Sequence, residues 1–143
     1  MAEQPRSPVR LLIASSDAVY RRYLADRLRS CGIEVLPWEE GDKESGERLD
    51  ASRVDVLLVE THGLDDADWA LIEEVRDRAP LIEIIAISSD PQVENAVQAL
   101  RSGVFEILTY PVSDSHLVNA ITSACSRKRY GEDRIKATER RTS

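Results

Sequence analysis

The sequence predicts an α/β domain built on a five-stranded parallel sheet with helices on both faces. Two observations carry this prediction. Short apolar runs alternate with amphipathic helical patterns along the chain, as repeated strand–helix units do. The runs at 54–59 and 82–87 lack strict alternation of apolar and polar residues, which is typical of strands buried on both sides. One helix is expected after each strand, five in all.

The chain before residue 41 holds two of these strands. The run at 9–14 ends in a polar trio, and a helix is expected over 18–30 because apolar residues recur there at helical spacing. Gly32 follows that helix, where a left-handed cap is favoured. A second strand over 33–36 stops at Pro37. The segment 41–52 is polar, so any helix there should be short or mobile.

The second half continues the same alternation. After the strand at 54–59, a helix is expected over 66–79 and a strand over 82–87. Asp90 and Pro91 form an N-cap followed by a first-turn proline, and the helix they begin should end at Gly103. The remaining elements are a strand at 105–109 and a final helix that Ser113 or Asp114 can cap.

Charge is distributed unevenly. The net charge is −7, which disfavours a general nucleic-acid-binding surface, because a phosphate backbone would be repelled. The last 17 residues hold seven Lys or Arg and three Asp or Glu, a local charge of +4 that leaves −11 elsewhere. We expect a flexible leader over 1–8, a domain over 9–126 and a charged extension over 127–143. Arg127–Tyr130 is either a basic contact surface or a solvated helix extension, Gly131 disfavours a continuous helix, and disorder is expected from Thr138.

Targeting signals and disulfides are not expected. No apolar run is long enough to span a bilayer, and the run at 9–14 is too short for a signal-peptide core, so a cytoplasmic protein is predicted. Cys31 and Cys125 lie far apart in helical patterns, which favours buried or half-buried free thiols.

Polar residues follow four of the predicted strands. In an open parallel sheet, ligands bind beyond the carboxyl ends of the strands. This rule selects four clusters in this sequence: Ser15-Ser16-Asp17, Glu60-Thr61-His62, Ser88-Ser89 and Tyr110-Pro111. No Ser-His-Asp spacing or nucleophile-elbow glycine pattern surrounds the serines, so hydrogen bonding or capping is expected of them rather than catalysis.

The same clusters carry a resemblance to a known family. Leu11-Leu12-Ile13-Ala14-Ser15-Ser16-Asp17, the strand Asp55 to Glu60, and the pattern Ala96-x-x-Ala99-Leu100-x-x-Gly103-Val104 with the later Pro111 resemble response-regulator receiver domains over about residues 9 to 125. The resemblance implies a flavodoxin-like three-layer sandwich with strand order 2-1-3-4-5. It also implies a cis bond before Pro111.

The resemblance implies a phosphorylation pocket that this sequence has altered. A receiver accepts a phosphoryl group on an aspartate and uses a preceding acidic pair to help hold Mg²⁺. Glu60 stands at the phosphoacceptor position, and Ser15 and Ser16 stand at the acidic pair, with Asp17 one place later. Tyr110 replaces the family's lysine, whereas Ser88 fits the hydroxyl-bearing switch position. We therefore expect no phosphotransfer, no metal, no cofactor and no enzymatic activity.

Two interpretations of Glu60 stay open. Its carboxylate lies about 1.5 Å farther along the side chain than that of aspartate, so it can imitate a phosphorylated aspartate if Ser88 turns inward to reach it. Alternatively, it reflects drift in a pocket without a chemical task. Ile107 stands where the family often has a switching aromatic residue, which makes the usual switch doubtful.

A phosphorylation-independent signalling module that binds protein partners is the function we expect. In receivers the fourth helix, fifth strand and fifth helix commonly contact partners or a second copy. The corresponding positions are Gln98, Arg101, Ser102, Ile107, Tyr110, His116 and Asn119. A homodimer through this face is an open alternative, as are retained binding of phosphate or a small ligand and a role as the receiver part of a longer transcriptional regulator.

Overall fold

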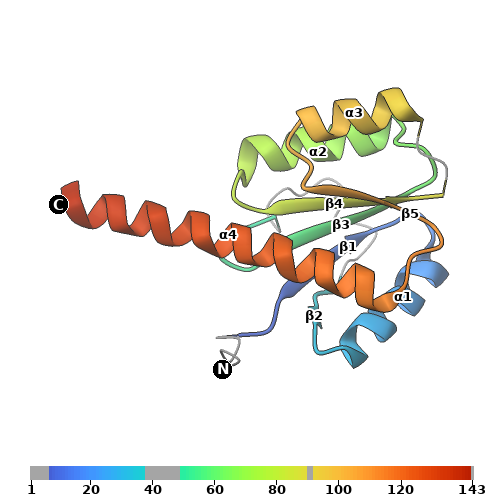
Figure 1. The fold of residues 1–143 in the computed structure, drawn as a ribbon, viewed down its shortest axis with the longest axis horizontal. Coiled ribbons are helices and arrows are strands. Elements are labelled where there is room, and N and C mark those ends of the chain that lie inside the picture. Colours follow the sequence, from blue (N-terminus) through green and yellow to red (C-terminus); the bar gives the residue numbers. More distant parts are fainter. Residues whose placement is uncertain (1–6, 38–48, 90–91, 143) are drawn as a thin grey trace.

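The computed structural model describes residues 7–37, 49–89 and 92–142, and strands alternate with helices along them (Figure 1). Five strands form one sheet: β1 (Arg10–Ala14), β2 (Glu34–Val35), β3 (Val56–Thr61), β4 (Glu83–Ser88) and β5 (Glu106–Thr109). The helices in these ranges are α1 (Ala18–Ser30), α2 (Asp66–Arg78), α3 (Val93–Arg101) and α4 (Asp114–Thr142).

The sheet has the topology that the sequence predicts. Its strand order is β2-β1-β3-β4-β5 and all neighbouring strands are parallel. Helices α1 and α4 lie on one side of the sheet, and α2 and α3 lie on the other (Figure 1). The flavodoxin-like, three-layer prediction is confirmed. Because all strands run the same way, the polar residues at their carboxyl ends are brought to one edge.

Alternate residues of each central strand supply two separate cores. Leu11, Ile13, Val56 and Leu58 pack with α1 and α4, whereas their neighbours Leu12, Ala14, Leu57 and Val59 pack with α2 and α3. All eight of these side chains are buried. Burial on both faces explains why the strands show no alternation of apolar and polar residues.

Two predicted helix boundaries differ from the structure. The short helix expected over 41–52 falls largely on residues 38–48, outside the described residues, and residues 49–52 begin no helix. Helix α3 begins at Val93 rather than at Pro91, because the N-cap Gln92 has an extended backbone with ψ of 138°. Asp90 and Pro91 lie outside the described residues. The described chain therefore shows four helices where five were expected.

Local expectations at Gly32 and the cysteines have mixed outcomes. Gly32 has a φ of +87°, so the predicted left-handed cap is confirmed. Cys125 is buried in α4, but Cys31 is exposed, so the expectation of burial was wrong for that residue. Cys31 is the C-cap of α1, and a helix end at the surface leaves its side chain in solvent.

Helix α4 is longer and more continuous than the sequence predicts. It runs unbroken through Gly131 and Thr138 to Thr142, so the expected break and disordered end were wrong. A glycine costs a helix interior about 1 kcal/mol. Here a methyl group on Gly131 would lie 3.2 Å from Leu81, so the glycine permits close packing, and Lys128 pairs with Glu132 one turn later at 3.0 Å. The distal part of α4 projects beyond the sheet (Figure 1).

A buried charge cluster anchors α4 at the amino end of the sheet. Asp55, just before β3, is fully buried and accepts hydrogen bonds from Arg10, Lys128 and Arg129 at 2.9 to 3.2 Å. Lys128 is also fully buried and donates to the Ala51 carbonyl oxygen. Burial alone would raise the pKa of Asp55, but the hydrogen bonds from Arg10 and Lys128 outweigh it and hold that pKa well below its usual range.

Replacing Asp55 should therefore destabilise the fold strongly. We expect Asp55→Asn to lower the free energy of unfolding at pH 7 by about 3 kcal/mol, because breaking one side of a buried pair leaves Lys128 poorly compensated. Urea denaturation followed by circular dichroism measures this. The matched control is Asp133→Asn, an exposed change on α4, the helix that carries Lys128. It should shift the free energy of unfolding by less than about 0.5 kcal/mol.

The same substitution should alter the response to acid. Because the folded pKa of Asp55 is depressed, its contribution is present at neutral pH and is lost as pH falls below the ordinary carboxyl range toward that folded pKa. The unfolding free energies of wild type and Asp55→Asn should converge as pH is lowered. A difference that stays constant with pH would contradict this account.

Candidate functional site

The carboxyl ends of β1, β3, β4 and β5 bring the predicted site residues to one edge of the sheet. Ser15 follows β1, and Glu60 is the penultimate residue of β3, opposite Ile87 of β4. Ser88 ends β4 and lies opposite Thr61. The Tyr110 backbone N–H donates to the Ser88 carbonyl oxygen at 3.0 Å, which ties the loop after β5 to the same edge.

Glu60 is held by Ser15. The Ser15 hydroxyl donates to Glu60 Oε2 at 2.6 Å, across the β1–β3 pair. The same Ser15 oxygen accepts the Asp17 backbone N–H at 3.1 Å, so its orientation is fixed from both sides. The serine predicted at one of the family's metal-binding positions therefore donates a hydrogen bond to the carboxylate predicted at the phosphoacceptor position.

The Ser88 hydroxyl proton is directed to a different acceptor. Ser88 Oγ donates to the His62 carbonyl oxygen at 2.7 Å, and the neighbouring Ser89 Oγ lies 2.8 Å from His62 Nδ1. A serine hydroxyl carries one proton, so the proton given to His62 cannot also be donated to Glu60. This arrangement does not match the Ser88–Glu60 bond that phosphate imitation requires.

The remaining acid after β1 has a structural task. The Asp17 carboxylate accepts the Tyr20 backbone N–H at 3.0 Å and is the N-cap of α1. Ser16 is exposed. Two serines and a capping aspartate do not make the acidic pair that a Mg²⁺ ion needs. Within residues 7–37, 49–89 and 92–142, no group of three or more His, Cys, Asp or Glu side chains is placed to hold a metal.

Tyr110 is a neutral, half-buried side chain beside Glu60. Its ring meets the Tyr20 ring edge-on, with centroids 5.6 Å apart. Burial raises the pKa of Tyr110 far above its ordinary value, and nearby Tyr20 and Glu60 raise it further. The phenol therefore stays protonated and brings no positive charge to the pocket. The bond between Tyr110 and Pro111 is cis.

Two contributors to this edge were missed at the level of sequence. Tyr20, in the first turn of α1, packs its ring on Tyr110. Arg21 donates from Nη1 to the Ser15 carbonyl oxygen at 2.8 Å. Its position six residues after Ser15, one turn into the following helix, is the signal that could have indicated this contact.

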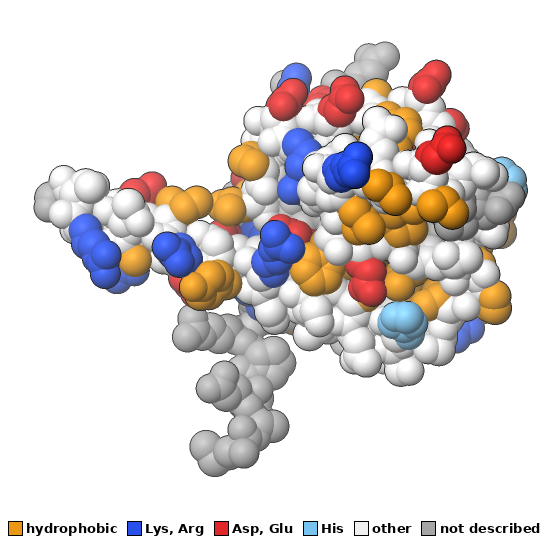
Figure 2. All heavy atoms as spheres, turned by 45° about the horizontal axis from the view of Figure 1, so that its top comes forward, with side chains coloured by type: hydrophobic (Ala, Val, Ile, Leu, Met, Phe, Trp, Pro, Cys, Tyr) orange, Lys and Arg blue, Asp and Glu red, His pale blue; other side chains and the backbone are white. Residues whose placement is uncertain are grey.

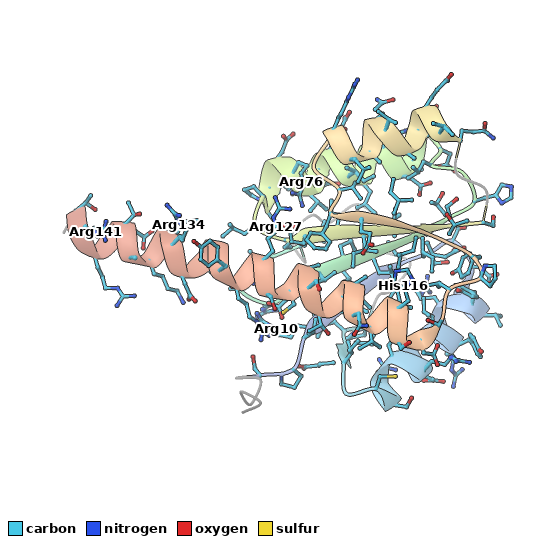
Figure 3. The ribbon with its side chains drawn as sticks, in the orientation of Figure 1. Arg10, Arg76, His116, Arg127, Arg134 and Arg141 are labelled. Atoms are coloured by element: carbon cyan, nitrogen blue, oxygen red, sulfur yellow. The ribbon has the colours of Figure 1, made fainter. Side chains whose placement is uncertain are left out.

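The predicted partner face lies beside the edge strand β5. Its fourth-helix, fifth-strand and fifth-helix components are α3, β5 and the start of α4. Ile107 is half-buried and packs against the core that lies under α2 and α3. Ser102 is half-buried as the C-cap of α3, and its hydroxyl donates to the Gln98 carbonyl oxygen. Tyr110 is also half-buried, and the remaining predicted positions are exposed: Gln98, Arg101, His116 and Asn119. Figure 3 labels His116 near the start of α4.

The structure adds an exposed apolar stripe to this region. Val93, Val97 and Leu100 recur at helical spacing on α3 and are 77%, 42% and 52% exposed, while Ala99 is the buried residue of the helix. Ala99 is the residue of α3 that packs in the core under α2 and α3. Figure 2, in which the layer of α2 and α3 comes forward, shows apolar side chains gathered on this side.

Known proteins are similar to this chain in sequence. The chain is 34% identical over 128 residues to the transcriptional regulatory protein PdtaR of Mycobacterium tuberculosis, covering 85% of this chain and 59% of that protein. It is 30% identical over 118 residues to the transcriptional regulatory protein GlrR of Escherichia coli K12, covering 82% of this chain and 26% of GlrR. No family model matches the chain.

A solved structure gives the corresponding fold. A response regulator receiver domain protein from Clostridium thermocellum superposes with a TM-score of 0.70 at 22% identity, covering 85% of this chain and 98% of that one. Fold and sequence likeness together support a response-regulator receiver domain of the CheY-like type. The chain spans about a quarter of the length of GlrR and 59% of PdtaR. No helix among the described residues is long and apolar enough to cross a membrane.

The Ser15–Glu60 bond predicts a specific pattern of mutational coupling. We expect Ser15→Ala to lower the free energy of unfolding by about 1.5 kcal/mol, the scale of a hydrogen bond to a charged group. In a Glu60→Ala background the same change should cost much less, because the acceptor is gone. Ser16→Ala, an exposed change one residue away, is the control and should be nearly neutral. Equal costs of Ser15→Ala in both backgrounds, measured by urea denaturation, would sink this interpretation.

Proposed function

We propose that this chain is a receiver module that signals without phosphorylation, by binding protein partners. The observation that carries the proposal is the Ser15–Glu60 hydrogen bond of 2.6 Å. In this bond, the residue predicted at a metal-binding position donates to the residue predicted at the phosphoacceptor position. Neither group is then available for the chemistry that a receiver performs with Mg²⁺ and an aspartate.

The neighbouring residues support the same proposal. Phosphoryl transfer needs positive charge near the developing phosphate oxygens. Tyr110 remains neutral beside Glu60, and Asp17 is engaged as the N-cap of α1. The Ser88 proton is given to the His62 carbonyl oxygen. These contacts favour one fixed state of the pocket over a state that changes with phosphate, and they favour drift over imitation for Glu60.

The surface for partners is the face of α3, β5 and the start of α4. Apolar side chains that stay exposed at regular helical spacing mark interaction sites more often than scattered ones do. Val93, Val97 and Leu100 form such a stripe, and exposed Gln98 and Arg101 flank it on the same helix. A partner with an apolar patch and a polar rim fits this surface. A homodimer is the symmetric version of the same contact.

A second candidate function comes from the lengths of the relatives. Two transcriptional regulatory proteins match this chain over 26% and 59% of their own lengths. The domain can therefore serve as the receiver part of a longer transcriptional regulator. In that case α4, which projects beyond the sheet, would be the connection to whatever follows (Figure 1).

The first test addresses phosphorylation directly. Incubation of the purified chain with acetyl phosphate and Mg²⁺ should give no phosphoryl adduct by intact mass measurement. As a positive comparison, a variant that restores the family's groups (Ser15→Asp, Ser16→Asp, Glu60→Asp and Tyr110→Lys) should regain a labile adduct if these positions are the cause. A stable adduct on the wild-type chain would overturn the proposal.

The second test addresses the partner face. Leu100→Asp should abolish recovery of partners by the tagged chain from its native cells, or self-association in sedimentation velocity. Ile135→Asp, on the projecting part of α4, is the matched control, because its side chain is similarly exposed at 45%. Glu60→Ala should leave recovery unchanged if Glu60 does not set the signalling state. If Ile135→Asp but not Leu100→Asp abolished the recovery of partners, the contact surface would lie on the projecting part of α4 instead.

A further inference from the structure

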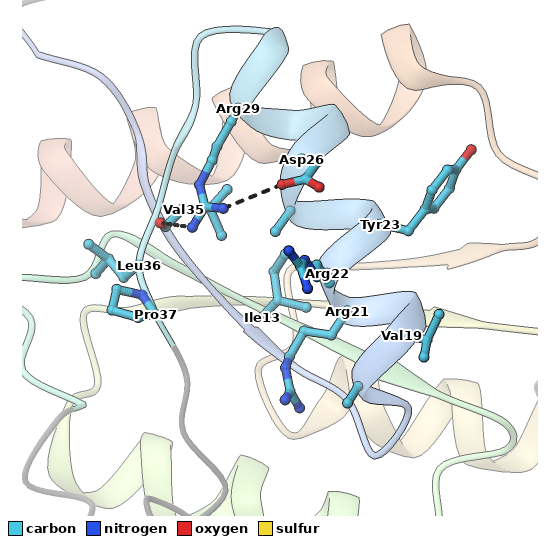
Figure 4. Close-up of a pocket in the computed structure, with 12 residues that line it drawn as sticks. Ile13, Val19, Arg21, Arg22, Tyr23, Asp26, Arg29, Val35, Leu36 and Pro37 are labelled. Carbon is cyan, nitrogen blue, oxygen red and sulfur yellow. Dashed lines mark hydrogen bonds and ion pairs between the residues drawn. The ribbon is translucent and has the colours of Figure 1, made fainter.

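A concave site lies between α1 and the segment after β2, which is the edge strand at the other end of the sheet from β5 (Figure 4). It has a volume of about 700 Å³, which falls in the size range of small-molecule sites. In Figure 4, Arg21, Arg22 and Arg29 lie along α1, facing the segment of Val35 to Pro37. The proposed function uses none of these arginines.

The three arginines differ in how they are held. Arg21 donates to the Ser15 carbonyl oxygen at 2.8 Å, and Arg29 donates to the Val35 carbonyl oxygen at 2.9 Å. Each is therefore positioned by one backbone contact, while other N–H groups of the planar guanidinium remain. Arg22 makes no hydrogen bond or ion pair with the described part of the chain. Pre-positioned donors lower the cost of ordering when a ligand binds.

The described lining of this site is positively charged, whereas the whole protein is negatively charged. The chain carries a net charge of −7, yet the described lining holds three arginines and one acid, Asp26. Asp26 lies 3.7 Å from Arg29, so it offsets one of the three cations through a long contact. Two guanidinium charges on an otherwise acidic body concentrate positive potential in a cleft, where it attracts anions.

The floor of the site is apolar. Ile13, Ala25 and Val35 are buried, and Leu36 and Pro37 continue the wall. A ligand that fills this space therefore needs an apolar or aromatic body as well as an oxyanion. Guanidinium groups bind phosphate in a two-pronged geometry that a compact ammonium cannot offer.

We propose that this site binds a small molecule that carries a phosphate group on an apolar or aromatic body, with a nucleotide as the representative class. The phosphate would contact Arg21 and Arg22, and the body would lie against Leu36 and Pro37. Arg21 also contacts the carbonyl of Ser15, whose hydroxyl holds Glu60. A bound phosphate that draws Arg21 toward itself would act on the same residue that fixes the altered receiver pocket.

Isothermal titration calorimetry on the full chain tests this proposal, with ATP as the probe. We expect a Kd below about 1 mM for ATP and none measurable for adenosine, because the phosphates supply the charged contacts. Arg22→Gln should weaken ATP binding about tenfold or more. Arg141→Gln, which removes the same charge at the far end of α4, should leave the Kd within about twofold (Figure 3).

A stability measurement on the variant and a competition with inorganic phosphate show which groups are responsible for ATP binding. Arg22 is exposed and makes no described contact, so Arg22→Gln should keep the wild-type melting temperature, which circular dichroism verifies. Inorganic phosphate should compete with ATP but bind more weakly, because it lacks the body that contacts the apolar wall. Absence of ATP binding, equal binding of adenosine, or full retention of binding in Arg22→Gln would each overturn the proposal.

Discussion

The parallel pairing of β3 between β1 and β4 is the constraint on which the rest of the structure depends. This register carries Val56 and Leu58 to one core and Leu57 and Val59 to the other, so one strand builds both layers. It also fixes what lies at the two ends of the strand. Asp55 enters the charge cluster at the amino end, and Glu60 meets Ser15 at the carboxyl end. A shift of one residue in this register would turn each β3 side chain to the other face of the sheet and would move Asp55 and Glu60 out of these contacts.

The altered pocket is understood best by following its protons and charges. A receiver pocket concentrates negative charge on one side, where a metal ion and a cation balance it. Here the Ser15 proton goes to Glu60 and the Ser88 proton goes to His62, while Tyr110 keeps its own. In the proposed pocket, one carboxylate that accepts a hydrogen bond from the neighbouring strand takes the place of the charges that a metal ion and a lysine would balance. The four departures from the family's pattern that the sequence predicts, at Ser15, Ser16, Glu60 and Tyr110, are therefore consistent with one another.

Much of the fold could be predicted from the sequence, because strand burial and helix periodicity are local signals. The strand order and the helices α1 and α2 agree with expectation to within a residue or two. The stripe on α3 and the continuity of α4 could not be predicted, because both depend on neighbours far along the chain. Ala99 is buried in the core while the larger Val97 and Leu100 stay exposed, and Gly131 lies in a helix where Leu81 packs closely against it.

The candidate site was predictable as a set of positions, whereas its contacts were not. The rule that ligands gather at strand ends selects Ser15, Glu60 and Ser88 from the sequence alone. Which hydroxyl donates to which acceptor depends on distances of a few tenths of an ångström, and spacing along the chain carries no such information. Only the folded structure shows that Glu60 accepts its hydrogen bond from Ser15, while Ser88 donates to the His62 carbonyl oxygen.

The charged end of the chain shows how composition can mislead about a surface. Its seven basic residues suggest a positive contact region when counted along the sequence. In the structure, Lys128 is fully buried and Arg129 donates to Asp55, so two of these cations neutralise an interior carboxylate. Arg127 lies 3.9 Å from the buried Glu83 and over the Phe105 ring. The basic residues nearest the domain therefore fasten α4 to the sheet, and what remains beyond them is a solvated helix of mixed charge. The interpretation of residues 127–130 as a free basic surface is thus the one that the packing disfavours.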